Sequence, residues 1–140
     1  MKRIPFQLSD GGCAFSSRPH EVRDCVVAAF AIVTDRLYDE VFDIIALAGR
    51  PSNQGFESDV WLKKTRGKVF GGQFKVVPVK VKSPVGRMVA LTPRTFGLLH
   101  PKGRYILETT QHTWALVDQT HYDLSLPKEK PLTGAWLWVP

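Results

Sequence analysis

The chain has 140 residues, the length of one compact domain, and its hydrophobic fraction of 44% excludes a disordered chain. The net charge of +6 favours contact with a polyanion, but the basic residues are spread along the chain, so a solvated basic surface is the simpler interpretation. The longest apolar run, residues 25–33, is too short to span a bilayer, and the first twelve residues lack the apolar core of a secretory signal. We therefore expect one domain over residues 1–140, without a membrane span.

The N-terminal half of the chain predicts helices. Residues 1–20 are expected to be irregular, and a first helix is expected over 24–33 because apolar side chains recur there at helical spacing. A second helix is expected over 38–48, ending at Gly49, and the two helices could pack as an antiparallel pair. A third helix is expected over 57–66. The side chains expected to face inward are Val26, Ala29, Phe30, Val33, Val41, Ile44, Ile45, Ala48, Val60, Trp61 and Leu62.

The C-terminal half predicts mostly sheet. Residues 74–82 alternate in part, as in a strand, and Pro78 indicates an edge or a bulge. A short helix is expected over 92–100, capped by Thr92 with Pro93 in its first turn. Further strands are expected at 104–110, 112–118, 121–123 and 135–140, the last placing Trp136 and Trp138 on one side, most simply in the core. This order predicts an α+β fold, with N-terminal helices packed on a C-terminal antiparallel sheet.

Two cysteines, Cys13 and Cys25, are candidate nucleophiles, and a reducing cytoplasm favours free thiols over a bridge between them. A reactive thiol is best placed at a helix N-terminus, which favours the thiolate and offers N–H groups to an oxyanion. Cys13 lies in a protease-like string, Cys-Ala-Phe-Ser, but Pro19 leaves no room for a helix there. Cys25 follows Asp24, a candidate N-cap, and precedes a buried helical face. A helix starting at Pro19, or burial of Cys25 as a core thiol, remains the alternative.

A cysteine nucleophile needs a base, usually histidine. His112 begins a predicted strand, and a hairpin turn at 118–120 would put Asp123 on the same sheet face, where it could orient the imidazole. His121 shares that face and is the alternative base, while Asp118 is most simply a turn former. The other histidines, both expected at the surface, are His20 and His100.

Two segments carry a resemblance to a known family. Residues 23–45 read "RDCVVAAFAIVTDRLYDEVFDII", and residues 100–123 read "HPKGRYILETTQHTWALVDQTHYD". With the "SNQGF" loop between them, their order and spacing resemble those of small papain-fold proteins of bacteriophages and prophages. The similarity spans about residues 22–123.

The resemblance implies a minimal papain-like cysteine peptidase fold. It matches Cys25 to the nucleophile, His112 to the base and Asp123 to the orienting acid, and it implies no metal or cofactor. Three positions depart from the family: Ala28 replaces arginine, Gln111 replaces the glycine before the histidine, and Pro19 stands at the position of papain's oxyanion glutamine. For that glutamine, the candidate substitutes are His20 and Gln54.

Two functions agree with this pattern. The first is a phage-encoded cysteine hydrolase, a peptidase or amidase, acting on a peptide or protein substrate. The second is a weakly active or inactive papain-fold protein that serves as a virion component or binds a host factor, for which the basic charge and four tryptophans suit an interface. Either would act in the host cytoplasm or the virion.

Overall fold

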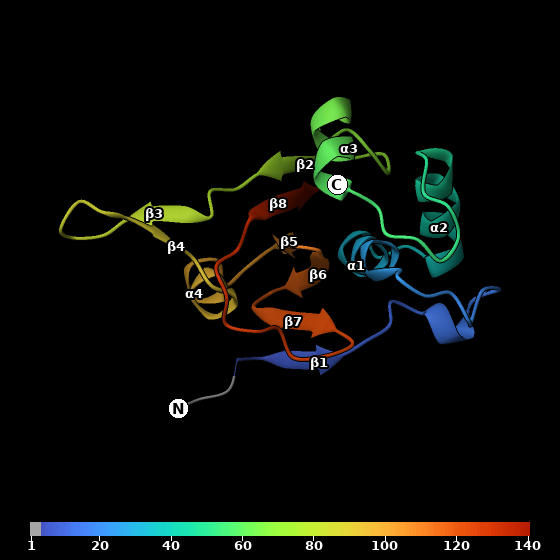
Figure 1. The fold of residues 1–140 in the computed structure, drawn as a ribbon, viewed down its shortest axis with the longest axis horizontal. Coiled ribbons are helices and arrows are strands. Elements are labelled where there is room, and N and C mark those ends of the chain that lie inside the picture. Colours follow the sequence, from blue (N-terminus) through green and yellow to red (C-terminus); the bar gives the residue numbers. More distant parts are fainter. Residues whose placement is uncertain (1–3) are drawn as a thin grey trace.

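The computed structural model describes residues 4–140, which form an α+β fold around a six-stranded mixed sheet (Figure 1). The helices are α1 (Cys25–Thr34), α2 (Tyr38–Leu47), α3 (Ser58–Thr65) and α4 (Pro93–Leu99). The strands, in their order across the sheet, are β1 (Phe6–Leu8), β7 (Thr120–Asp123), β6 (His112–Val117), β5 (Arg104–Thr109), β8 (Gly134–Val139) and β2 (Gln73–Val76). The remaining elements are the hairpin of β3 (Lys80–Lys82) and β4 (Met88–Ala90), and a 3₁₀ helix at Cys13–Phe15. The predicted α+β class is confirmed.

Helix α1 lies between the sheet and α2, so it is covered on two sides (Figure 1). This position explains why its sequence is apolar almost throughout, rather than on one stripe alone. The main core contains six side chains of α1, namely Val26, Val27, Ala29, Phe30, Ala31 and Val33. From the sheet, that core contains Ile106, Ala115, Trp136 and Trp138. Both tryptophans of β8 are therefore buried, as predicted.

A second core fills the opposite face of the sheet beneath α4. Its central side chain is Phe96, which packs with Leu107, Trp114 and Leu116. The Thr92 side chain accepts a hydrogen bond from the Thr95 backbone N–H, and Pro93 occupies the first turn, so the predicted start of α4 is confirmed.

The sheet is mixed, whereas the sequence predicted an antiparallel one. Strand β1 lies within the segment expected to be irregular, and it pairs in parallel with β7, with Phe6 opposite His121 and Leu8 opposite Asp123. A three-residue strand whose partner is more than a hundred residues away leaves little local pattern in the sequence. The other pairings in this sheet are antiparallel.

Further predictions were wrong in detail, among them Ala48 at the end of α2, which was expected to face inward and is exposed. The strand expected over 74–82 is divided, because the chain leaves the sheet after Val76 and Pro78 separates β2 from β3. In α3, Leu62 is buried and Trp61 is partly buried, but Val60 is 52% exposed and faces solvent. The first and second helices end within a residue or two of their predicted bounds.

Candidate active site

Cys25 is the first residue of α1, and Cys13 is not at an α-helix terminus. The first N–H groups of an α-helix have no partner within the helix, and the helix dipole is positive there. The Cys25 thiol, which is partly buried, therefore lies at the positive end of the helix dipole. Asp24 occupies the N-cap position, as predicted, but its side chain makes no capping hydrogen bond. The Asp24 carboxylate instead accepts a hydrogen bond from the Tyr38 hydroxyl at 2.7 Å.

His112 and Asp123 are in direct contact, as the strand register predicted. The β6–β7 hairpin pairs Val117 with Thr120, and this register puts Asp123 on the sheet face of His112. The distance between His112 Nε2 and Asp123 Oδ2 is 2.6 Å. Asp123 is buried, and its other oxygen accepts a hydrogen bond from the Leu124 N–H. The carboxylate is therefore held in place while it orients the ring.

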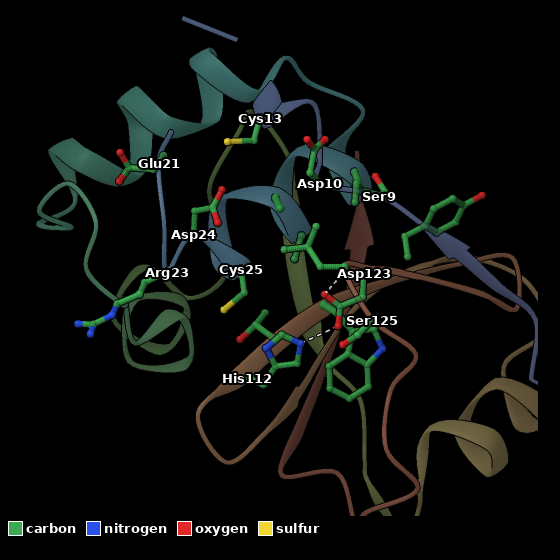
Figure 2. A pocket seen from close by; sticks show the side chains of 17 residues that line it. Ser9, Asp10, Cys13, Glu21, Arg23, Asp24, Cys25, His112, Asp123 and Ser125 are labelled. Atoms are coloured by element: carbon green, nitrogen blue, oxygen red, sulfur yellow. Dashed lines mark hydrogen bonds and ion pairs between the residues drawn. The ribbon is translucent and has the colours of Figure 1, made fainter. Parts of the chain in front are cut away.

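The second nitrogen of His112 is on the side of Cys25. In Figure 2 the thiol and the Asp123 carboxylate lie on opposite sides of the imidazole ring. The hydrogen bond to Asp123, followed by that to Cys25, raises the pKa of His112 to about 10, against the opposing effect of burial. The raised pKa favours the protonated ring, which places a positive charge beside the Cys25 thiol. Trp114 stacks on the ring with centroids 5.7 Å apart and keeps it in this plane.

Cavities open on both sides of this pair. One, of about 480 Å³, is lined by Cys25, His112 and Asp123 together with residues of the N-terminal segment such as Ser9 and Asp10 (Figure 2). A second, of about 620 Å³, lies between α3 and the end of β5 and also contains Cys25 and His112. A third, of about 630 Å³, lies beneath the 124–133 loop and contains His112 and Asp123. An extended substrate could therefore cross the site.

The loop before Cys25 is held by residues that no sequence pattern singles out. Arg50 is 3% exposed and forms an ion pair with Glu21 at 3.0 Å. Its guanidinium also donates to the carbonyls of Val22 and Arg23, and the Asn53 side chain accepts from the Val22 N–H. An isolated arginine after a glycine resembles any surface arginine, so only the fold reveals this contact.

The remaining candidates lie apart from the reacting groups or have another role. His121 is buried, accepts a hydrogen bond from the Trp114 indole, and has its pKa lowered to about 4 by burial, so it is not positioned as the base. Asp118 lies in the β6–β7 hairpin turn, as expected of a turn former, and its side chain accepts a hydrogen bond from the Gly103 N–H. His20 is exposed and His100 half-buried, and neither lines the cavities around Cys25; nor does Gln54.

Cys13 is a buried thiol, and both cysteines are free. Its Sγ donates to the Arg18 carbonyl at 3.4 Å, and burial raises the pKa of the thiol. Cys13 also lines the cavity that contains Cys25, so the N-terminal segment borders the site as well as packing on the core.

Two positions at which the sequence differs from the phage papain-fold proteins that it resembles have distinctive local surroundings. A Cβ on Gly11 would lie 2.6 Å from the Ala28 backbone, so the N-terminal segment packs closely over the position where the family has arginine. Gln111 has a φ of 65°, the left-handed conformation that glycine adopts most easily.

No group of three or more histidine, cysteine or acidic side chains among residues 4–140 is arranged to hold a metal ion. Within the same residues, no helix is long and apolar enough to cross a bilayer. No protein-family model matches the chain, and comparisons with curated proteins and with solved structures found no match to it. The papain-like fold and the phage family therefore rest on the sequence motifs.

Proposed function

We propose that this protein is a papain-like cysteine hydrolase, a peptidase or amidase, of the kind that bacteriophages encode. The observation that carries the proposal is the contact of His112 with buried Asp123 at 2.6 Å, with Cys25 across the ring at the start of α1. A nucleophile, a base and an orienting acid in this order make up the machinery of acyl transfer. The motif resemblance supports the same function.

The reaction would proceed in two steps. The Cys25 thiolate attacks the carbonyl carbon of an amide, and the tetrahedral oxyanion is stabilised by N–H groups at the start of α1. As the C–N bond breaks, the His112 imidazolium gives its proton to the leaving amine, which departs and leaves a thioester on Cys25. Neutral His112 then takes a proton from water, and the hydroxide formed attacks the thioester to release a carboxylic acid and the thiolate. Asp123 holds the ring in the tautomer that both steps need.

The test is His112-dependent reactivity of Cys25. A unit charge about 4 Å away is worth about 1–4 kcal/mol, so loss of the imidazolium is expected to slow alkylation of Cys25 by about tenfold or more. The measurement is the rate of iodoacetamide labelling at pH 7, followed by mass spectrometry, in Cys13→Ala protein with and without His112→Ala. His20→Ala is the matched control, and it is expected to leave the rate unchanged because His20 is exposed and does not line the cavities around Cys25.

Equal labelling rates with and without the His112 imidazole would contradict the proposal. That result would favour the second function, a papain-fold protein that binds a partner without catalysis. A fluorogenic peptide library assayed against Cys25→Ala as the blank then separates a hydrolase from a reactive but non-catalytic thiol.

A further inference from the structure

An acidic cavity adjoins Cys25 on a protein whose net charge is +6. The cavity, of about 620 Å³, is bordered by the start of α3, the end of β5 and the turn that leads to His112. Three of the residues that line it are acidic, namely Glu57, Asp59 and Glu108, and among residues 4–140 no lysine or arginine lines it. The cavity on the other side of His112 has the opposite character, since it contains Lys128 and Lys130.

Glu108 is the buried carboxylate of this cavity. The residue is 9% exposed and belongs to β5, where its neighbours Ile106 and Leu107 are core residues. Its Oε1 accepts a hydrogen bond from the Ser58 hydroxyl at 3.2 Å, but no lysine, arginine or histidine in the described part of the chain forms an ion pair with it. A buried carboxylate without a counter-ion is costly, which points to a positive partner from outside the chain.

The surroundings of Glu108 keep this carboxylate available. Gly134 lies opposite on β8, and a Cβ there would come within 3.1 Å of Glu108 Oε2, so glycine leaves room for the carboxylate. Burial raises the pKa of Glu108 to about 7, with a further contribution from Asp59 and smaller opposing effects from Ser58 and Lys63. A bound cation would lower the pKa of Glu108 again, because it stabilises the ionised carboxylate.

We propose that this cavity is a subsite for a cationic group of the substrate, an ammonium or guanidinium held by Glu108, with Asp59 adding negative charge. Because the same cavity includes Cys25 and His112, the cationic group would lie beside the bond that Cys25 attacks. That the bound cation belongs to a substrate rests on the proposed function. That the cavity binds a cation next to Cys25 does not rest on it, so the subsite and the hydrolase can be contradicted separately.

Charge-matched thiol reagents test the subsite directly. Propyl methanethiosulfonate is neutral, and its 2-aminoethyl analogue is of similar size and carries a positive charge at pH 7. Both transfer their alkylthio group to the Cys25 thiolate and release methanesulfinate. The quantity measured in Cys13→Ala protein is the rate with the cationic reagent divided by the rate with the neutral reagent, and this ratio is then divided by the same ratio for free 2-mercaptoethanol. We expect the acidic cavity to raise this normalised ratio about fivefold.

Two variants assign that preference to the cavity. Glu108→Gln is expected to return the normalised ratio close to one, and Asp59→Asn, at the partly exposed start of α3, to lower it by about half. Glu40→Gln on α2 is the matched control and is expected to leave it unchanged. A normalised ratio near one in the Cys13→Ala protein would overturn the subsite. A raised ratio that stays unchanged in both Glu108→Gln and Asp59→Asn would overturn it as well. His112→Ala should slow both reagents, the neutral one more than the cationic one, because the imidazolium that it removes lines the same cavity and repels a cation. An unaffected rate with both reagents would contradict the hydrolase and leave the subsite standing.

Discussion

His112 is the residue on which the proposed chemistry depends, and its pKa is set mainly by one neighbour. Asp123 is the largest cause of the raised pKa, ahead of Cys25. The folded-state pKa of about 10 lies above the usual value of 6.5, so the ionised ring stabilises the folded protein. That stabilisation is fully present below pH 6.5 and is lost as the pH rises through about 10. Since the side chain is 41% exposed, solvent screens part of it.

Asp123→Asn is therefore expected to lower the pKa of His112 by one unit or more. Imidazole carbon shifts recorded by NMR across pH 3–11 would measure this, and the Cys25→Ser variant is expected to give a smaller decrease. His121 supplies an internal control, because burial, not Asp123, lowers its pKa to about 4. A His112 pKa that did not respond to Asp123→Asn would mean that the hydrogen bond does not form in solution.

The sequence predicted the positions of some residues of the candidate site and not those of others. The position of Cys25 at a helix start, and that of Asp123 on the sheet face of His112, could be predicted because helix starts and strand alternation are local patterns. Glu108 could not be, because a glutamate within a β-rich run reads equally well as a solvent-facing residue. Asp24 followed the rule for N-caps, yet its carboxylate binds Tyr38, a contact that depends on how α2 packs beside α1.

Among the elements, those with long periodic runs were predicted well. Helices α1 and α2 carry strong apolar patterns, and α4 has both a threonine cap and a proline in its first turn. Strand β1 is three residues long and is held mainly by β7, so its formation depends on a partner distant in the sequence. The separation of β2 from β3 is likewise decided by which strand each one pairs with.

The β5–β6 turn is the element that presents His112, and it contains a strained residue. Gln111 has a φ of 65°, a conformation that costs a non-glycine residue about 1 kcal/mol or more. Gln111→Gly is expected to raise the free energy of unfolding by about 0.5–1 kcal/mol, measured by urea denaturation, because glycine adopts this conformation without strain. Gln54→Gly, at a loop position without positive φ, is the matched control and should not stabilise the protein. A loss of stability in Gln111→Gly would show that its side-chain contacts outweigh the strain.

At the scale of the whole molecule, the candidate site forms where segments from distant parts of the chain meet. The thiol comes from the start of α1, the imidazole and carboxylate from the β6–β7 hairpin, and the buried acid from β5. The N-terminal segment closes one side, with Ser9 N–H donating to the Asp123 carbonyl at 2.9 Å. Long-range assembly of this kind is why the sequence could suggest which residues react but not what surrounds them.

Arg50 joins two of these segments, since it follows α2 and binds the loop that leads into Cys25. The pair it forms with Glu21 is buried, and the guanidinium lies 5.4 Å from the centre of the Phe42 ring. The Nε and Nη1 atoms of Arg50 have no hydrogen-bond partner among the described residues. The polar contacts of the guanidinium are therefore all made by Nη2, with the Glu21 carboxylate and two backbone carbonyls. The orientation of the loop therefore depends on this side chain together with Asn53, whose side chain accepts from the Val22 N–H.

Arg50→Ala is expected to lower the free energy of unfolding by about 3 kcal/mol, because it leaves the Glu21 carboxylate buried without its partner. It should also slow iodoacetamide labelling of Cys25 in the protein that remains folded, since the loop before α1 loses its anchor. Urea denaturation and mass spectrometry measure the two effects. Arg87→Ala, in the exposed turn between β3 and β4, is the matched control and should change neither. If Arg50→Ala lost stability while Cys25 kept its reactivity, Arg50 would support the fold without positioning the thiol.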